Sequence, residues 1–212
     1  MRAARAPAIA ATATTSTAVA DRHPSPALLA RLFDPRSVAV VGASANPRKL
    51  GHALVQNLQR GGYRGRIYPV GRGGEEILGM PSFSSLRALP EVPDLVLVSV
   101  PAAATPEIAA DAAAIDAGAM IVLACGFAEA GDEGRGLQRA LLEQAGAVRV
   151  IGPTCMGVAN LHASLNATYF RELPAEPGPV AVISQTAPSG ALRSISCAAT
   201  ASACRALSRS AT

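Results

Sequence analysis

The sequence alternates between short, continuously apolar runs and longer segments in which apolar residues recur every three or four positions. The short runs are rich in β-branched residues and predict buried strands, which we place at residues 37–41, 66–70, 94–100, 119–124 and 149–151. The longer segments predict helices, which we place at residues 27–33, 49–60, 105–117 and 133–144. Strands that alternate with helices of this length predict an α/β fold with a Rossmann-like, doubly wound parallel sheet.

In a doubly wound sheet, ligands bind beyond the carboxyl ends of the strands. The segments that follow the predicted strands are residues 42–44, 71–73, 100–101, 125–127 and 152–154. We therefore expect these segments to line one edge of the sheet and to contain the binding site.

The segment Gly42-Ala43-Ser44 connects the first predicted strand to a helix. Its residues carry little or no side-chain bulk, so a ligand can approach the backbone, and the free N–H groups of the next helix favour phosphate. The dinucleotide fingerprint G-x-G-x-x-G is not met, because Ser44 stands two positions after Gly42, and the P-loop pattern is also absent. The loop therefore predicts a phosphate-bearing ligand without identifying it.

The ends of the chain differ in composition from its middle. Residues 1–25 are mostly Ala and Thr with scattered Arg, which predicts a disordered leader, with a transit peptide as the less favoured reading. We expect a stable domain over residues 26–155, a connecting segment over 156–178, and the first strand of a second, incomplete α/β domain at 179–186. Residues 187–212 are mostly Ala, Ser, Thr, Arg and Cys, with no acid and few bulky apolar residues, and predict an unstructured tail.

The composition of the chain limits the kinds of partner that we expect it to bind. Half of the residues are apolar, which is enough for a core, and no apolar run approaches the roughly 20 residues that cross a bilayer, so we expect no membrane partner. The net charge of +4 lies at the ends, with +2 in residues 1–26 and +3 after residue 176, so it does not support a nucleic-acid surface. Four cysteines without C-x-x-C spacing favour a reduced, cytoplasmic protein.

Two groups of side chains invite a catalytic interpretation that we do not favour. Cys125 and Cys155 follow predicted strands, but no histidine is placed to activate them, so packing is the simpler role. Glu129, Asp132 and Glu133 stand near a helix start, where carboxylates interact with the helix dipole and cap N–H groups. We predict no catalytic residue and no metal site.

Several spaced motifs occur in an order that resembles one known family. They are 32–44 (Leu-Phe-Asp-Pro-Arg-Ser-Val-Ala-Val-Val-Gly-Ala-Ser), Lys49-x-Gly51, 67–70 (Ile-Tyr-Pro-Val), 126–129 (Gly-Phe-Ala-Glu), 151–157 (Ile-Gly-Pro-Thr-Cys-Met-Gly), 165–168 (Leu-Asn-Ala-Thr) and 183–185 (Ile-Ser-Gln). Over residues 26–186 the chain resembles the N-terminal part of the NDP-forming acyl-CoA synthetases, relatives of the succinyl-CoA ligase α subunit. The resemblance implies a CoA-binding domain followed by flavodoxin-like ligase domains and an ATP-grasp domain or subunit as partner.

The resemblance also implies site residues. Gly42, Ala43 and Ser44 would face the CoA phosphates, and Arg72 would replace a lysine that meets the nucleotide end in the ligase α subunit. Lys49 is a further phosphate candidate, although a lysine at a helix start often only faces water. The residues that would flank the pantetheine are Val100, Pro101, Cys125 and Gly126. The family more often has Asn at the position of Thr154.

The family's phosphorylated histidine has no counterpart here. His23, His52 and His162 stand outside its sequence context, so we expect the chain to be incompetent for the ligase cycle alone. Suitable codons for residues 187–212, read in a shifted frame, give a family-like continuation, and we interpret this segment as a frameshifted tail. The alternative function is a non-catalytic Rossmann module that binds NAD(P) or CoA as a sensor or redox-type protein. Because Arg72, and not an acid, follows the second strand, the sequence favours CoA or NADP over NAD.

Overall fold

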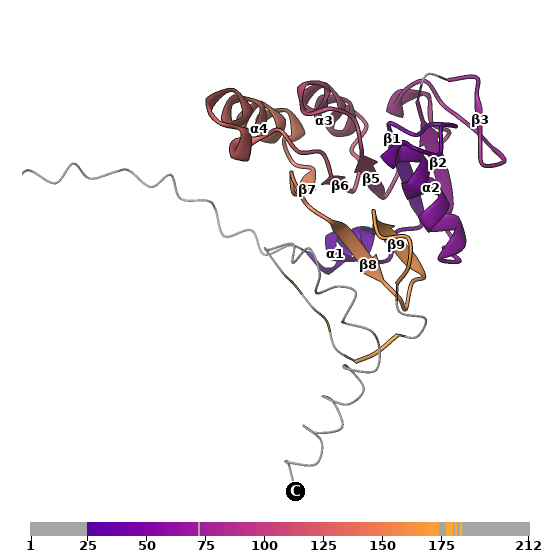
Figure 1. Cartoon of the computed structure of the whole chain (residues 1–212). Coiled ribbons are helices and arrows are strands. Elements are labelled where there is room, and N and C mark those ends of the chain that lie inside the picture. The colour runs from indigo at the N-terminus through magenta and orange to yellow at the C-terminus, as the bar shows by residue number, and fades with distance from the viewer. Residues whose placement is uncertain (1–24, 72, 174–176, 180, 182, 184–212) are drawn as a thin grey trace, which may run out of the picture.

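The computed structural model describes residues 25–71, 73–173, 177–179, 181 and 183. Its centre is a five-stranded parallel sheet with the strand order β2-β1-β5-β6-β7 (Figure 1). The strands are β1 (Ser37–Val41), β2 (Arg66–Val70), β5 (Leu95–Val98), β6 (Ala119–Val122) and β7 (Arg149–Ile151). Strands β1, β5 and β6 are buried along their whole length, as expected for central strands covered on both faces. The predicted fold class is therefore confirmed.

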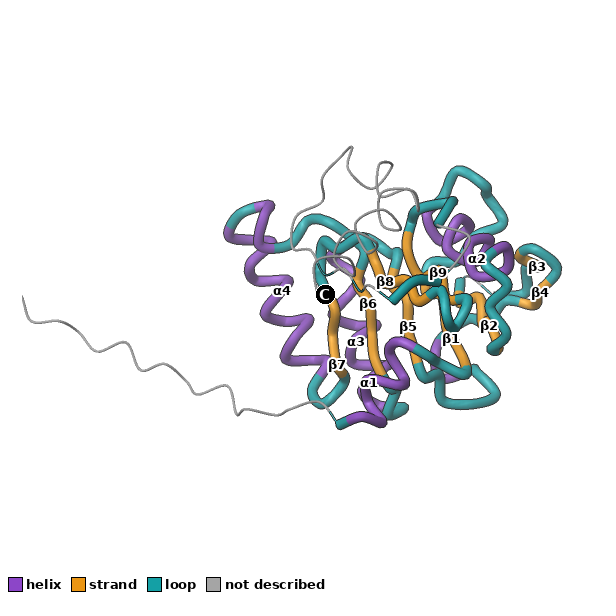
Figure 2. The backbone as a smooth tube through the Cα atoms, turned by 90° about the horizontal axis from the view of Figure 1, so that it is seen from below, coloured by secondary structure: helices purple, strands orange, loops and turns teal. Residues whose placement is uncertain are grey.

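Within the described residues, four α-helices cover the sheet, two on each face, and Figure 2 shows the helices and strands from a second side. The α-helices are α1 (Pro26–Phe33), α2 (Leu50–Arg60), α3 (Thr105–Ala114) and α4 (Asp132–Ala145), and three short 3₁₀ helices occur at η1 (Leu86–Ala88), η2 (Ala102–Ala104) and η3 (Ala128–Ala130). Leu32 of α1 and Leu54 of α2 pack against one face of the sheet, whereas Ala109 of α3 and Leu141 of α4 pack against the other. Alternate side chains of each strand thus enter two separate apolar layers.

Two hairpins complete the described part of the fold. The small one pairs β3 (Glu76–Ile77) with β4 (Met80–Pro81), and the larger one pairs β8 (Gly157–Asn160) with β9 (Leu165–Thr168). The β8–β9 hairpin lies within the segment that we expected to be a loose connection, and the structure instead packs its Leu165 and Ala167 into the same core as α2. Asn57 of α2 holds it there, because its amide donates to the carbonyls of Thr168 (2.8 Å) and Phe170 (3.0 Å).

The strand order places the change of winding direction at β1. The chain moves outward from β1 to β2 and then returns to β5 on the other side of β1. All five strands are parallel, so their carboxyl ends share one edge, which we call the carboxyl edge. In open α/β sheets, ligands bind at this edge, next to the strand where the winding reverses.

Several predictions fall outside the described residues. The leader at 1–25 and the tail at 187–212 do so almost entirely, as does most of the strand expected at 179–186, and Arg72 is also outside. Across the described ranges, no helix is both long and apolar enough to cross a bilayer. The domain boundary placed at residue 155 remains a prediction.

Candidate functional site

The loop from residue 42 to residue 49, here called the β1–α2 loop, leaves the sheet at the change of winding direction. Gly42 has φ +88°, and a Cβ at this position would lie 2.7 Å from Ser99 Oγ and 3.1 Å from Val100 Cγ1. Ser99 follows β5, and its hydroxyl donates to the Val41 carbonyl at 2.9 Å. The end of β1 and the end of β5 are therefore in contact through a position where only glycine fits.

Gly51 brings helix α2 against the start of this loop. A Cβ on Gly51 would lie 1.9 Å from the Gly42 carbonyl oxygen, so the helix backbone touches the loop backbone directly. In dinucleotide-binding folds a glycine fulfils the same need for close helix–strand packing. The sequence analysis included Gly51 in a motif but did not identify this role. Gly51 stands nine positions after Gly42, which is too long a spacing for the familiar fingerprint.

Polar contacts shape the remainder of the β1–α2 loop. Ser44 Oγ accepts from the Asn46 N–H at 3.2 Å, and Asn46 Oδ1 accepts from the Arg48 N–H at 2.9 Å. His52 is buried in the first turn of α2, and its Nδ1 lies 3.0 Å from the Ser44 carbonyl oxygen. The loop is thus held by its own turns and by a side chain of the helix that follows it. The sequence analysis assigned His52 no part in the loop.

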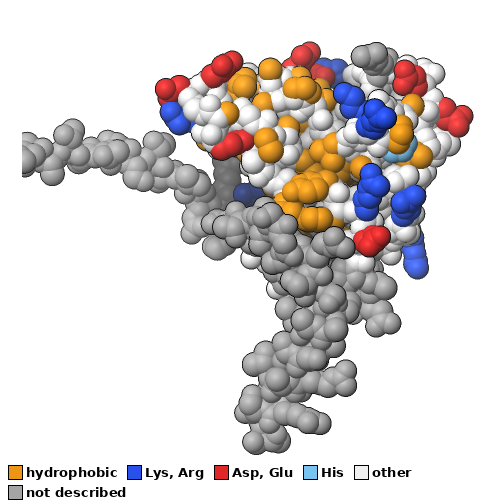
Figure 3. All heavy atoms as spheres, viewed as in Figure 1, with side chains coloured by type: hydrophobic (Ala, Val, Ile, Leu, Met, Phe, Trp, Pro, Cys, Tyr) orange, Lys and Arg blue, Asp and Glu red, His pale blue; other side chains and the backbone are white. Residues whose placement is uncertain are grey.

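The first N–H groups of α2 point toward the carboxyl edge without partners inside the helix, as at any helix start. Lys49 is the N-cap residue, is exposed, and makes no side-chain capping bond. Arg48 beside it is exposed too, and Figure 3 shows Lys and Arg side chains on the side of the surface that α2 occupies. The edge near α2 is therefore electropositive through both the helix dipole and its side chains.

The loops after β2, β5 and β6 extend the same edge. A Cβ on Gly71, after β2, would lie 2.8 Å from the Ala43 carbonyl oxygen, and a Cβ on Gly126, after β6, would lie 3.3 Å from Ala102 Cβ. We call residues 100–102 and 125–126 together the β5–β6 rim. Val100 is half-buried there, Gly126 has φ +105°, and Pro101 and Cys125 are exposed.

The structure therefore brings together the predicted residues that it describes. Contacts run without a break from the end of β2 through the β1–α2 loop to the end of β5, and on to the end of β6. Arg72 is the predicted site residue that lies outside the described ranges, so its phosphate contact remains a prediction.

Glu129 ties the last two strand ends together. Its Oε1 accepts from the N–H groups of Gly126 (2.7 Å) and Phe127 (3.2 Å) and from Thr154 Oγ1 (2.7 Å), while the Thr154 N–H donates to the Ala124 carbonyl at 3.0 Å. The bonds from Gly126 and Thr154 are the main reasons that the pKa of Glu129 falls to about 2. The sequence analysis expected a capping role for this residue but not the link to the loop after β7.

The two cysteines near this edge differ in surroundings. Cys125 is exposed, whereas Cys155 is partly buried and its thiol donates to the Val122 carbonyl at 3.3 Å. Burial raises the pKa of the Cys155 thiol, which keeps it protonated and disfavours a nucleophilic role. Within the described residues, no cluster of three or more His, Cys, Asp and Glu side chains could hold a metal ion.

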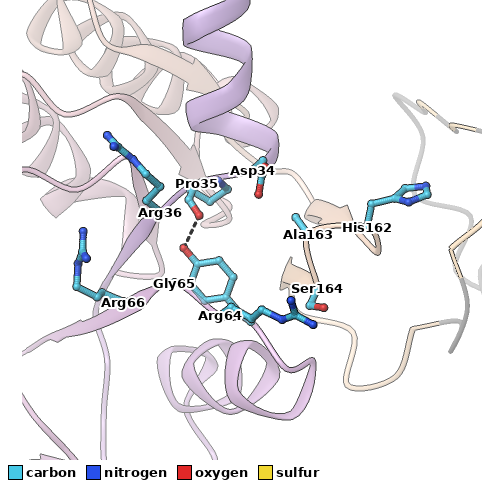
Figure 4. A pocket seen from close by; sticks show the side chains of 10 residues that line it. Asp34, Pro35, Arg36, Arg64, Gly65, Arg66, His162, Ala163 and Ser164 are labelled. Carbon is cyan, nitrogen blue, oxygen red and sulfur yellow. Dashed lines mark hydrogen bonds between the residues drawn. The ribbon is translucent and has the colours of Figure 1, made fainter.

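A cavity of about 600 Å³ opens at the opposite, amino-terminal edge of the sheet (Figure 4). Its arginines do not converge: in Figure 4 the Arg36 and Arg66 head groups lie on one side and Arg64 extends to the other. Arg36 is bonded to Asp94 and Arg66 to Glu91, so two of the three charges are already neutralised. This cavity contains none of the predicted site residues, and it is not our candidate site.

Known proteins resemble this chain in sequence. A family model described as "CoA binding domain" matches residues 36–160. The chain is 39% identical over 170 residues to the acetate–CoA ligase (ADP-forming) I subunit alpha of Pyrococcus furiosus, covering 77% of this chain and 36% of that one. It is also 39% identical over 158 residues to the acetate–CoA ligase (ADP-forming) I of Archaeoglobus fulgidus, covering 74% of this chain and 23% of that one.

The chain also superposes on solved structures. A protein of Pyrococcus horikoshii superposes with a TM-score of 0.72 at 32% identity, covering 79% of this chain and 40% of that one. The dinucleotide forming acetyl-coenzyme A synthetase 1 of Ca. Korarchaeum cryptofilum, in complex with phosphate and ADP, superposes with a TM-score of 0.65 at 31% identity, covering 69% and 32%. The chain thus spans about a quarter to two fifths of the length of these relatives.

Proposed function

The chain belongs to the family of CoA-binding domains, and from this we propose that it binds coenzyme A at the carboxyl edge of its sheet, as the CoA-binding module of an ADP-forming acid–CoA ligase. The observation that carries the proposal is the contact between Gly51 and the Gly42 carbonyl, which sets the start of α2 directly behind the β1–α2 loop. In such a ligase CoA is a substrate and not a resident cofactor.

The phosphates of CoA would bind against the β1–α2 loop. Gly42 and Ala43 present backbone with little side-chain bulk, and the N-terminal end of α2 contributes N–H groups and a positive dipole. Lys49, exposed at the N-cap, would add a mobile cation beside these groups. Arg72, predicted from the sequence, would supply a guanidinium suited to bidentate contact with a phosphate.

The pantetheine arm would lie along the β5–β6 rim. This arm is uncharged, and the rim offers the half-buried Val100, the exposed Pro101 and Cys125, and the backbone of Gly126. The small Ala102 packs against Gly126, so a linear chain could cross this part of the edge close to the backbone. Charge supports this orientation, because the cations lie beside α2 and the Glu129 carboxylate lies beyond the rim.

Isothermal titration of the whole chain with CoA, and with NADP and NAD for comparison, tests the proposal. We expect micromolar affinity for CoA, a loss of about fivefold to tenfold in Lys49→Ala and in Arg72→Ala, and no change in the control Arg60→Ala at the other end of α2. If the chain binds NADP or NAD and does not bind CoA, it belongs to the alternative class of redox or sensor modules. Failure to bind any of the three ligands would contradict both assignments.

We further propose that this chain performs only the CoA-binding part of the ligase reaction. The phosphorylated histidine and the ATP-grasp part of the ligase cycle would come from another domain or subunit, so this chain alone would bind CoA without turning it over. An assay with acetate, ATP and CoA is expected to show no CoA consumption by the chain by itself. Turnover by the purified chain would overturn this division.

A further inference from the structure

The Glu129 carboxylate is a junction between two loops that the sheet alone does not join. Its Oε1 accepts hydrogen bonds from two N–H groups of the loop after β6 and from one hydroxyl of the loop after β7. The N–H of Thr154 crosses between the same two loops to the Ala124 carbonyl. Two hydrogen bonds, both from Thr154, therefore join the end of β7 to the end of β6, and the two N–H bonds to Glu129 hold its carboxylate within the loop after β6.

This junction determines where Gly126 lies. The Gly126 N–H makes the shortest backbone bond to Glu129, at 2.7 Å, and Gly126 holds a backbone conformation with φ +105°. On its other side Gly126 meets Ala102 so closely that an added Cβ would lie 3.3 Å from the Ala102 Cβ. A loop released from Glu129 would change the spacing of the β5–β6 rim.

The junction does not extend to the phosphate side of the site. In the structure the bonds of Glu129 reach residues 126, 127 and 154, whereas the β1–α2 loop is held by its own turns, by His52 and by Gly51. A carboxylate would also repel a phosphate and tolerate an uncharged arm. Loss of Glu129 is therefore expected to affect one part of a bound CoA molecule and spare the other.

We propose that Glu129 is a positioning residue that holds the β5–β6 rim in the geometry that accepts the pantetheine arm of CoA. The inference rests on the proposed function, because the rim has this role only if CoA binds along it. Glu129 touches no reacting atom in this account and acts through Gly126 and Thr154.

Calorimetry of Glu129→Ala with two ligands tests the proposal. CoA contains the pantetheine arm, and adenosine 3′,5′-bisphosphate represents only the nucleotide end. We expect Glu129→Ala to lower the affinity for CoA about tenfold and to leave the affinity for adenosine 3′,5′-bisphosphate within twofold of the unmodified chain. Glu129→Gln, which keeps an acceptor oxygen but not the charge, should fall between the two. Asp132→Ala removes an equal charge three residues away, from a side chain paired only with Arg135 in the described structure, and should change neither affinity.

A second readout needs no ligand. The Gly126 amide proton, bonded to a carboxylate at 2.7 Å, should resonate downfield in the unmodified chain and in Asp132→Ala, and should shift upfield in Glu129→Ala. An equal loss of affinity for both ligands, or an unchanged affinity for CoA in Glu129→Ala, would overturn the positioning role. If the unmodified chain binds neither CoA nor adenosine 3′,5′-bisphosphate, the proposed function is wrong, and so is this inference.

Discussion

The Gly51 α-carbon lies against the Gly42 carbonyl, so closely that a Cβ on Gly51 would lie 1.9 Å from that oxygen. Neither backbone can yield easily, because Gly42 is fixed against Ser99 and the N–H of Gly42 donates to the Val70 carbonyl at 2.9 Å. The contact thus fixes α2 and the β1–α2 loop relative to the ends of β2 and β5.

Gly51→Ala is expected to push α2 away from the loop. We expect a loss of about 1–3 kcal/mol in the free energy of unfolding, as for other overpacked sites, and a loss of CoA affinity of more than tenfold. Denaturant unfolding and calorimetry measure the two effects. Gly136→Ala in α4 is the matched control, since a Cβ there meets nothing within 4 Å, and it should gain up to about 1 kcal/mol from helix propensity. Equal effects of the two substitutions would show that the contact with Gly42 is not tight.

Asn57→Ala is expected to release the β8–β9 hairpin from α2. The substitution removes the Asn57 donor from the Thr168 carbonyl and one of the two donors of the Phe170 carbonyl, which also accepts from the Asn166 amide at 3.0 Å, at a cost of about 1–3 kcal/mol. Hydrogen exchange should accelerate across residues 165–168 before it does so in β1. The control Gln59→Ala removes an exposed bond from the same helix to the Leu78 carbonyl and should cost less than about 1 kcal/mol. Unchanged exchange in the hairpin would contradict the role of Asn57.

Thr154→Asn is expected to stabilise the chain. Thr154 has φ +55°, a conformation that disfavours β-branched residues and suits Asn. An Asn amide can still donate to Glu129, so the junction between the two loops would persist. Thermal unfolding should show a rise in Tm of a few degrees, corresponding to about 0.5–1 kcal/mol. A lower Tm would mean that the Thr154 hydroxyl makes a bond that the amide cannot replace.

The stability contributed by the Glu129 charge should be lost in acid. Its pKa in the folded chain is about 2, below the ordinary value of about 4.3 in an unfolded chain. A depressed pKa adds stability above the unfolded value, and this contribution disappears as the pH falls from about 4.3 to 2. The Tm difference between the unmodified chain and Glu129→Gln should therefore shrink over that interval, while other carboxyl groups titrate equally in both proteins. A difference that stays constant from pH 7 to pH 2.5 would contradict the shifted pKa.

Hydrophobic patterning was sufficient to predict the central sheet and its four helices. Strands such as 37–41 are continuously apolar, and that pattern has few explanations besides a strand covered on both faces. The alternation of strands and helices predicted a doubly wound parallel sheet, whereas the order of its strands came from the structure.

The β8–β9 hairpin escaped prediction because its burial does not follow hydrophobicity. All four residues of β9 are buried, yet two of them, Asn166 and Thr168, are polar. The Thr168 hydroxyl donates a hydrogen bond to Asn166 Oδ1 at 2.7 Å. The sequence does alternate apolar and polar residues across β9, but in a segment with turn-forming residues throughout, and the segment was interpreted as a connection. The partner that accounts for the burial, Asn57, stands 111 residues earlier.

Local sequence also could not show which small or acidic residues organise the site. Gly51 and Gly136 are both glycines of amphipathic helices, and only the tertiary fold shows that one touches a carbonyl and the other touches nothing. Glu129 and Asp132 likewise look equivalent at a helix start, but only Glu129 faces the loop after β7. The candidate residues that the structure describes lie at the carboxyl ends of the strands, their role in binding stays a prediction, and their supporting contacts required the structure.

An amide-resolved NMR titration of the chain with CoA tests the central claim most directly. The account predicts that the largest shift changes fall on residues 42–52 of the β1–α2 loop and the start of α2, with a second group on residues 100–102 and 125–127. Shift changes confined to the amino-terminal edge, around Tyr63, Arg64 and Ser164, would contradict a CoA site at the carboxyl edge.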